Sequence, residues 1–313
     1  MKLVIMEPLG VEQNKLLSMA QAVLPQDIEI TYYDTRVLDT DTLISRGRDA
    51  DILAVSNLPL NGDVINGCKN LKLLAVAFTG VDHIALDVCR QRGITVCNCA
   101  GYSTAAVADL VFGMVVALYR NLIACNEAVR RQGTKDGLIG FELEEKTFGI
   151  IGTGAIGLRV ASIAQAFGCR VLAYSRTQKN VPGVTYTDLE TLLKTSDIVS
   201  LHTPLTPETR GLIGAKELAS MKPSAILINT ARGPVVDSAA LADALNSGKI
   251  AGAGIDVFEM EPPVPEDHPL LNAKNLIATP HVAFATKEAL VKRAAIVFDN
   301  IDRWLKGTPA NVI

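Results

Sequence analysis

Three polar motifs in the second half of the chain each follow an apolar run that is typical of a buried strand. The first supplies a guanidinium at Arg232, the second supplies three carboxylates within residues 256–261, and the third supplies an imidazole at His281. A guanidinium can hold a carboxylate through two hydrogen bonds, and a nearby carboxylate favours the protonated form of an imidazole. Because ligands of open α/β sheets bind beyond the carboxyl ends of the strands, the pattern predicts proton transfer beside a bound carboxylic acid.

The chain has four histidines. His281 is the strongest candidate for a proton donor and acceptor, because it comes directly after the last predicted strand. The alternative is a loop histidine without a chemical role. His202 ends another predicted strand and lies either beside a ligand or in a structural position. His83 either faces a cleft or caps a helix, and His268, in a proline-rich stretch, is expected in a solvated loop.

A glycine-rich turn follows the apolar run at residues 147–151 and opens a helical pattern. In this setting a G-x-G-x-x-G sequence binds the pyrophosphate of a dinucleotide. Gly152 permits the tight turn, Gly154 lets the phosphates approach, and Gly157 lets the helix pack near the strand. The helix N-terminus supplies free N–H groups. The expected contacts are Gly152, Gly154, Ala155, Ile156 and Gly157, and the alternative is a plain strand-to-helix turn.

The end of the next predicted strand indicates which dinucleotide binds. An NAD site usually has an acidic residue there, which accepts hydrogen bonds from the ribose hydroxyls. This chain has Ser175, Arg176 and Thr177 instead, followed by Lys179, and no carboxylate. A planar guanidinium beside two hydroxyls suits a 2′-phosphate. The sequence therefore favours NADP(H), and NAD(H) stays possible if these are solvated turn residues.

Short apolar runs alternate with helical patterns in two blocks, and 313 residues are too many for one ordinary core. We therefore expect an α/β fold of two doubly wound parallel-sheet domains. The expected strands of the first block are residues 2–6, 29–33, 50–56, 72–78 and 94–98, and those of the second are residues 147–151, 170–174, 198–202, 225–229, 251–255 and 276–279.

Six strands in the block that contains the glycine turn are the number expected for a Rossmann domain. We expect one long helix, residues 104–131, to link the two blocks, and the helical segment 287–306 to cross back onto the first block. The expected domains are a discontinuous, flavodoxin-like substrate domain, residues 1–100 plus 284–313, and an inserted Rossmann domain, residues 101–283, which includes the linking helix.

Composition argues against several other classes of protein. The formal net charge is −3 without a basic cluster, so nucleic acid and acidic membranes are not expected partners. The first apolar run is too short for a signal peptide, and the most apolar segment, residues 105–118, is too short to span a membrane. The six cysteines include no C-x-x-C pair. We expect a cytoplasmic protein with buried cysteines and no metal site.

Together these motifs resemble those of the D-isomer-specific 2-hydroxyacid dehydrogenases, which include glyoxylate/hydroxypyruvate reductases, D-lactate dehydrogenases and phosphoglycerate dehydrogenases. The resemblance covers almost the whole chain and rests on motifs in a consistent order, namely residues 80–82, the glycine turn, 202–214, 229–237, 256–262 and 280–281. It implies a homodimeric enzyme that transfers hydride between NAD(P)H and a small 2-oxo acid such as glyoxylate or hydroxypyruvate. The turn at Arg176 is similar to that of NADPH-dependent glyoxylate/hydroxypyruvate reductases.

The resemblance also implies a catalytic set of Arg232, Glu261 and His281. Arg232 would hold the substrate carboxylate, and His281, kept protonated by Glu261, would donate a proton during reduction. The expected substrate contacts are Arg232, His281, the backbone near Thr79 and Gly80, and Asn57. Cofactor contacts beyond the glycine turn are expected at Thr104, Ser175, Arg176, Thr177, His202, Thr203, Pro204, Thr230, Ala231, Asp256 and His281.

Two other functions stay open. One is a phosphoglycerate dehydrogenase-like enzyme, which is disfavoured because no regulatory domain follows Ile313. The other is a catalytically silent, NAD(H)-sensing protein of the corepressor type. The intact set of Arg232, Glu261 and His281 argues against a silent protein.

Overall fold

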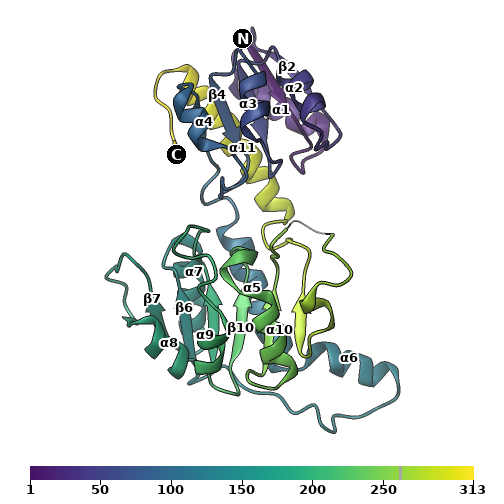
Figure 1. Cartoon of the computed structure of the whole chain (residues 1–313), viewed down its shortest axis with the longest axis vertical. Coiled ribbons are helices and arrows are strands. Elements are labelled where there is room, and N and C mark those ends of the chain that lie inside the picture. The colour runs from purple at the N-terminus through teal and green to yellow at the C-terminus, as the bar shows by residue number, and fades with distance from the viewer. Residues whose placement is uncertain (261–262) are drawn as a thin grey trace. The chain divides into compact units, whose positions relative to one another are not determined.

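The structure is a computed structural model that describes residues 1–260 and 263–313. Over these residues the chain divides into two compact units: unit 1 comprises Met1–Ser103 and Ala285–Ile313, and unit 2 comprises Thr104–Phe284. Each unit contains one sheet whose paired strands are all parallel, with helices on both faces (Figure 1). The α/β class with two doubly wound sheets is therefore confirmed.

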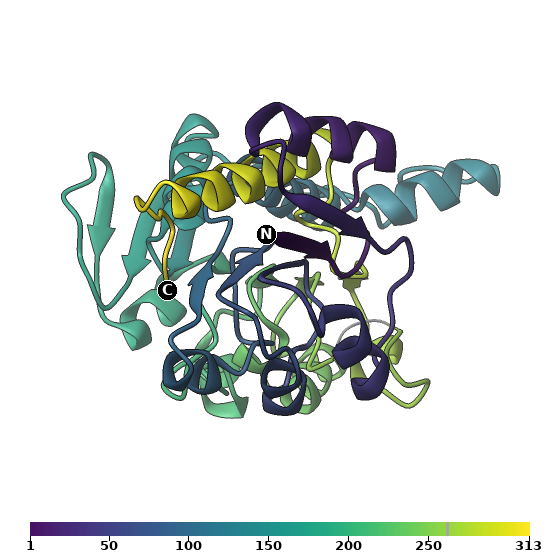
Figure 2. The same ribbon diagram turned by 90° about the horizontal axis from the view of Figure 1, so that it is seen from above.

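Unit 1 has the strand order β2-β1-β3-β4-β5, which is the flavodoxin-like order. Helices α1 and α11 contact each other on one face, and α2, α3 and α4 lie on the other (Figure 2). The central strands β3 and β4 are buried at every position because both faces of the sheet are covered. The elements are β1 (Lys2–Ile5), α1 (Gln13–Val23), β2 (Glu29–Tyr32), α2 (Thr40–Gly47), β3 (Ile52–Val55), α3 (Gly62–Gly67), β4 (Leu73–Val76), α4 (Leu86–Gln91), β5 (Thr95–Cys97) and α11 (Lys287–Leu305).

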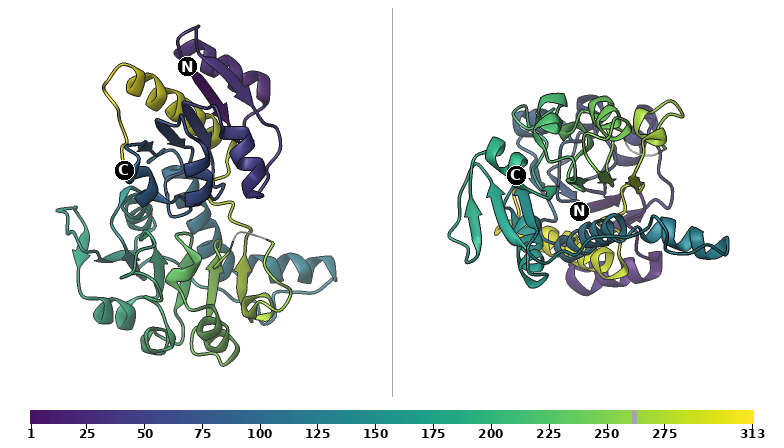
Figure 3. Two further views of the ribbon diagram at one scale, coloured as in Figure 1. Left: turned by 45° about the horizontal axis from the view of Figure 1, so that its top comes forward. Right: turned by 90° about the horizontal axis from the view of Figure 1, so that it is seen from below.

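Unit 2 has the strand order β12-β11-β10-β9-β6-β7-β8, a Rossmann order extended by one strand. Helices α5 and α7 pack side by side on one face, and α8, α9 and α10 follow one another on the other (Figures 1 and 3). The elements are α5 (Thr104–Tyr119), α6 (Leu122–Arg130), β6 (Thr147–Ile151), α7 (Ala155–Ala166), β7 (Arg170–Tyr174), β8 (Val184–Tyr186), α8 (Leu189–Thr195), β9 (Ile198–Leu201), α9 (Ala215–Ser220), β10 (Ile226–Asn229), η1 (Gly233–Val235), α10 (Ser238–Asn246), β11 (Gly252–Ile255), η2 (Pro269–Asn272) and β12 (Leu276–Ala278).

Two local predictions were wrong. The expected single helix over residues 104–131 is two helices, α5 and α6, which meet at a bend of 57°. Asn121, between them, has a φ of 50°, a left-handed conformation that interrupts a helix. The strand β8 was not expected, because its three residues are half-buried or exposed and form no apolar run. Unit 2 therefore has seven described strands rather than six.

The described helices include none that is by itself long and apolar enough to cross a membrane, although the bent pair α5 and α6 passes on combined length and composition. Five of the six cysteines are buried and Cys125 is partly exposed. Burial raises the pKa of the Cys99 thiol to about 12, so this thiol stays protonated near neutral pH.

Candidate functional site

The glycine turn joins β6 to α7 at the carboxyl edge of the unit 2 sheet. Gly152 has a φ of 98°, and a Cβ on it would lie 2.6 Å from the carbonyl oxygen of His202, so no side chain fits there. Gly154, in contrast, faces open space, and no described side chain caps the N-terminus of α7. Free N–H groups at a helix start, beside an open surface, fit a phosphate group.

The turn that follows β7 is tied to the glycine turn. Lys179 donates from Nζ to the carbonyl oxygen of Thr153 at 3.1 Å, and the hydroxyl of Tyr186 donates to Thr153 Oγ1 at 3.1 Å. Both contacts hold the expected 2′-phosphate residues beside the glycine turn. Those residues are accessible, with Ser175 half-buried and Arg176 and Thr177 exposed.

The ends of β9 and β10 carry buried hydroxyls without protein partners. Thr203 Oγ1 and Thr230 Oγ1 are enclosed, and neither makes a hydrogen bond to the described residues. Buried polar atoms in native structures nearly always have a partner, so a ligand that reaches this edge would satisfy them. Beside them, His202 Nε2 lies 2.9 Å from Ser200 Oγ, and burial lowers the pKa of His202 to about 3. The imidazole is enclosed and neutral, although the residue as a whole keeps some exposure. The residues at this edge therefore fit a dinucleotide.

Arg232 lies in the turn after β10 and is half-buried. The buried side chain of Asn229 shapes this turn: its Nδ2 donates to the Arg232 carbonyl oxygen at 2.9 Å, and its Oδ1 accepts from the Ala231 N–H at 3.0 Å. The next residue, Gly233, lies so close to the backbone of Phe258 that any Cβ would collide with it. The turn that carries Arg232 is thus packed directly on the segment that follows β11.

His281 follows β12 and is held by Asp256, which follows β11. Its backbone N–H donates to the Asp256 carbonyl oxygen at 2.8 Å, and its φ of 55° lies in the left-handed region, which is uncommon for a residue with a side chain. The fully buried Asp256 carboxylate accepts from Thr279 Oγ1 at 2.6 Å, from the Val282 N–H at 2.8 Å and from the Ala283 N–H at 2.9 Å. One carboxylate therefore binds the Thr279 side chain before His281 and the backbone of Val282 and Ala283 after it. Burial raises the pKa of Asp256, and these hydrogen bonds oppose the rise.

The proline-rich stretch is a loop whose residues 263–267 are exposed or half-buried, as expected, but His268 itself is buried, 8% exposed. Its Nε2 lies 3.0 Å from Glu259 Oε2, its Nδ1 accepts from the Leu270 N–H at 3.3 Å, and its ring packs edge-on against Phe258. Only the His268 side chain packs on the segment after β11, while the residues just before it stay accessible. The expected catalytic carboxylate, Glu261, lies outside the described residues.

The expected substrate residues of unit 1 follow two adjacent parallel strands. Asn57 comes after β3, and Thr79 and Gly80 come after β4. The buried Asn98 donates from Nδ2 to the Thr79 carbonyl oxygen at 2.8 Å and so fixes that loop. The Nε2 atom of His83 lies 3.0 Å from the Ser56 carbonyl oxygen.

The sequence analysis missed two residues of this edge, Glu7 and Arg36, which hold Asn57. Only Glu7 had a signal in the sequence, because it is an acidic residue within an otherwise apolar stretch, residues 3–9, that begins in β1. Thr104, expected to contact the cofactor, is the first residue of α5 and is half-buried.

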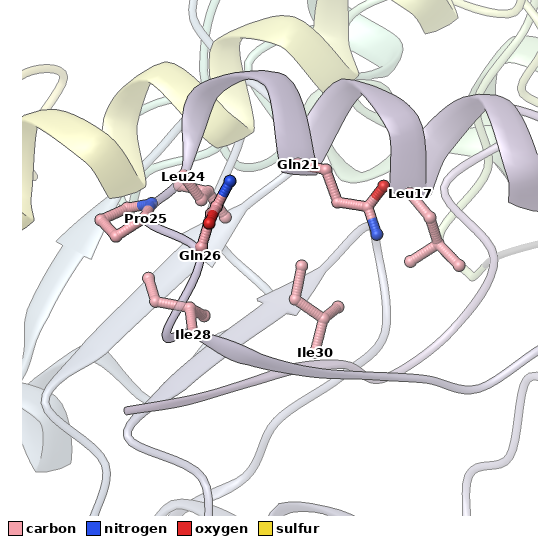
Figure 4. Close-up of a pocket in the computed structure, with 7 residues that line it drawn as sticks. All are labelled: Leu17, Gln21, Leu24, Pro25, Gln26, Ile28 and Ile30. Atoms are coloured by element: carbon pink, nitrogen blue, oxygen red, sulfur yellow. The ribbon is translucent and has the colours of Figure 1, made fainter.

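A hollow between α1 and β2 lies elsewhere in unit 1 (Figure 4). Its lining contains no titratable side chain, so it is not a candidate for proton transfer; the residues are Leu17, Gln21, Leu24, Pro25, Gln26, Ile28 and Ile30. Within the described ranges no group of three His, Cys, Asp or Glu side chains is arranged to hold a metal ion.

The unit 2 residues predicted to bind cofactor or substrate after β6, β7, β9, β10, β11 and β12 all follow carboxyl ends of parallel strands. They therefore lie along one edge of the sheet, where ligands of such folds bind. This edge combines a glycine turn that fits a phosphate, a guanidinium and a constrained histidine, which is compatible with a nicotinamide-dependent oxidoreductase.

Comparisons with known proteins agree with this geometry. Residues 112–283 match the family model for the D-isomer specific 2-hydroxyacid dehydrogenase, NAD binding domain. The chain is 36% identical over 294 residues to a hydroxypyruvate reductase of Blautia hydrogenotrophica, with 91% of each chain covered. It is 38% identical over 317 residues to a glyoxylate reductase of Aeropyrum pernix, with 94% of each covered. The solved structure of an acyclic imino acid reductase, Bsp5, in complex with NADPH and D-Arg is similar over 100% of both chains, with a TM-score of 0.91 and 32% identity.

The chain belongs to the D-isomer specific 2-hydroxyacid dehydrogenase family. It is an oxidoreductase that uses a nicotinamide cofactor, and members of its family act on small 2-hydroxy or 2-oxo acids.

Proposed function

We propose that this enzyme reduces a small 2-oxo acid, glyoxylate or hydroxypyruvate, with NADPH. The observation that carries the proposal is the constrained His281 loop, which Asp256 fixes at the same sheet edge as the Arg232 turn and the glycine turn. The reductases of Blautia hydrogenotrophica and Aeropyrum pernix support the choice of substrate.

In this proposal Arg232 binds the substrate carboxylate through its two-pronged guanidinium, and its charge stabilises the negative charge that develops on the C2 oxygen. A bound nicotinamide supplies the hydride. Protonated His281 donates its proton to the C2 oxygen, and in the reverse direction neutral His281 accepts it. Asp256 holds the His281 backbone, so the imidazole does not have to be ordered during the reaction.

Glu261 is proposed as the acidic partner of His281. Three carboxylates follow β11, and two of them have other partners: Asp256 binds the backbone after β12, and Glu259 binds His268. The choice of Glu261 among the three rests on the family resemblance, and the hydrogen bonds of Asp256 and Glu259 are compatible with it. The role proposed for Glu261 is to stabilise the positively charged imidazolium form that donates the proton.

NADPH is favoured over NADH because Arg176 is exposed beside Ser175 and Thr177, and no carboxylate follows β7 to repel a 2′-phosphate. The NADPH complex of Bsp5, a protein of similar structure, supports this choice. A cytoplasmic location stays a prediction from the sequence.

We also propose a homodimer that forms through α6. None of the residues of α6 is buried, and Leu122, Ile123 and Val129 are 49%, 54% and 74% exposed. The helix projects from the body of unit 2 (Figures 1 and 3). Exposed apolar side chains that gather on one projecting element are typical of a surface that another protein covers.

A panel of 2-oxo acids with NADPH and NADH, measured by absorbance at the nicotinamide band, tests the activity. His281→Ala should lower kcat by about 10²–10⁴-fold, the usual contribution of a general acid, while NADPH affinity measured by fluorescence titration stays within about twofold. Arg232→Ala should raise KM steeply as well as lower kcat. A His281→Ala enzyme with most of its activity would require another proton donor, and cofactor binding without any turnover in the wild type would favour the corepressor-type alternative.

A further inference from the structure

Two charged residues hold Asn57 in one orientation at the carboxyl edge of the unit 1 sheet. Glu7, 2% exposed, accepts through Oε1 from the N–H groups of Ser56 and Leu58 at 2.8 and 3.0 Å. Its Oε2 accepts from Arg36 Nη1 at 2.7 Å. The same Nη1 donates to Asn57 Oδ1 at 2.6 Å, and Nη2 donates to the Asn57 carbonyl oxygen at 3.2 Å. The guanidinium thus binds both oxygens of one asparagine, and the carboxylate fixes the backbone around it.

This arrangement determines which end of the Asn57 amide is offered to a ligand. A guanidinium can only donate hydrogen bonds, so the atom that faces Arg36 is the amide oxygen. The other end of the Asn57 amide, the Nδ2 amino group, donates a hydrogen bond to none of the described residues. A ligand beside Asn57 therefore meets the two N–H donors of Nδ2. An oxygen atom on the ligand can accept a hydrogen bond from one of them.

Asn57 is a direct neighbour of the loop at Thr79 and Gly80, whose backbone is expected to contact the substrate. Strands β3 and β4 are paired, and such strands lie about 4.8 Å apart. The loops that follow them are joined, because the Leu60 N–H donates to the His83 carbonyl oxygen and the Ala85 N–H donates to the Leu60 carbonyl oxygen, both at 3.0 Å. A small acid that contacts the backbone at Thr79 and Gly80 would therefore lie within reach of the Asn57 side chain.

Building on the proposed function, we propose that Asn57, held by Arg36 and Glu7, selects 2-oxo acids whose third carbon carries a neutral oxygen. The substrate class is that of hydroxypyruvate, whose hydroxyl oxygen would accept from Nδ2. Glyoxylate and pyruvate lack this oxygen and leave the donor unpaired.

The net charge of Glu7 and Arg36 distinguishes acids with a neutral oxygen on the third carbon from acids with an anionic group there. Arg36 alone would attract an anionic group on the third carbon, such as a phosphoryl or carboxylate group. Glu7 lies 2.7 Å from Arg36 Nη1 and cancels its charge, so the pair offers no net attraction to an anion. The cluster therefore disfavours 3-phosphohydroxypyruvate, the substrate expected of a phosphoglycerate dehydrogenase-like enzyme.

The test compares kcat/KM for hydroxypyruvate, pyruvate and 3-phosphohydroxypyruvate with NADPH, using the full-length enzyme. Asn57→Leu keeps the shape of the side chain but removes both donors. It should lower kcat/KM for hydroxypyruvate about tenfold, the scale of one lost hydrogen bond, and change the value for pyruvate less than twofold. A lysine in place of Arg36 cannot bind both Asn57 oxygens in the same way. Arg36→Lys should therefore also lower kcat/KM for hydroxypyruvate relative to kcat/KM for pyruvate.

Arg46→Lys is the matched control, since Arg46 donates to the carbonyl oxygens of Met6 and Thr35 in the same unit and makes no contact with Asn57. It should leave the hydroxypyruvate-to-pyruvate ratio unchanged. Glu7→Gln, which leaves Arg36 without its counter-charge, should raise the activity toward 3-phosphohydroxypyruvate relative to hydroxypyruvate.

Equal losses on hydroxypyruvate and pyruvate in Asn57→Leu would assign Asn57 a structural role only and overturn the proposal. So would a wild-type enzyme that prefers the phosphorylated acid. A wild type that reduces none of the 2-oxo acids would instead contradict the proposed function itself, so the two failures are distinguishable.

Discussion

Replacing His202 by glutamine should remove a specific pH dependence from the stability of unit 2. Burial lowers the pKa of this imidazole from 6.5 to about 3, and its Nε2 is 2.9 Å from Ser200 Oγ. The folded protein therefore keeps His202 neutral at pH values at which the unfolded chain binds a proton. Because the unfolded state then holds more protons, the stabilisation is complete above pH 6.5 and is lost as the pH falls toward 3.

The size of the effect follows from the interval between the two pKa values. One pKa unit corresponds to about 1.36 kcal/mol, and pH 5 lies about 1.5 units below the unfolded pKa of histidine. Protonation of the unfolded chain should therefore cost the wild type about 2 kcal/mol between pH 7 and pH 5 through His202 alone. Glutamine can still bond to Ser200 but takes up no proton, so the variant should lack this loss.

Urea unfolding of both proteins at pH 7, 6 and 5, followed by far-ultraviolet circular dichroism, measures the difference. The single tryptophan, Trp304 in α11, lies in unit 1 and provides an internal control. Where the two units unfold separately, tryptophan fluorescence follows the unfolding of unit 1. The free energy of that transition should change with pH by the same amount in the wild type and in His202→Gln. If the far-ultraviolet signal also showed equal losses, within about 0.5 kcal/mol, the idea of an enclosed, permanently neutral imidazole would be refuted.

Three further predictions concern neighbouring elements. Asp256→Asn replaces one accepting oxygen by a donor and should destabilise unit 2 by about 1.5–3 kcal/mol in urea unfolding and lower kcat; unchanged values would show that the His281 loop does not depend on the carboxylate. Arg176→Ala should shift the ratio of kcat/KM for NADPH over NADH at least tenfold toward NADH, and a constant ratio would remove Arg176 from cofactor choice. Combined Ile123→Ser and Val129→Ser should shift sedimentation from dimer to monomer; a persistent dimer would place the interface elsewhere.

The fold class could be predicted because the chemistry-bearing motifs follow apolar runs directly. A parallel strand covered on both faces is a continuous apolar segment, and the glycine turn and Arg232 follow two such buried strands, β6 and β10. His281 follows β12, whose residues form an apolar run although they are half-buried or exposed. The failures occurred where this signal is absent. Strand β8 lies at an edge, and its side chains remain half-buried or exposed. The break between α5 and α6 had a local signal, since asparagine is one of the few residues that readily adopt the left-handed conformation seen at Asn121.

The partners of the polar side chains could not be predicted from the sequence. Arg36 lies 29 residues from Glu7 and 21 from Asn57, and no periodic pattern relates these positions. Proline-rich composition correctly indicated an accessible loop at residues 263–267, but composition does not indicate that the side chain of His268 at its end is buried. Its bond to Glu259 arises only from the tertiary fold.

A buried carboxylate performs the same task in each unit. Glu7 accepts three hydrogen bonds beside Asn57, and Asp256 accepts three beside His281, two of each set from backbone N–H groups. An amide side chain offers a single accepting oxygen, so it could not replace either carboxylate without leaving a donor unpaired. Burying an ionised group costs free energy, and charge-assisted bonds offset that cost only when the loop keeps one conformation. The same bonds that make the buried acid tolerable therefore hold the neighbouring Asn57 or His281 in place.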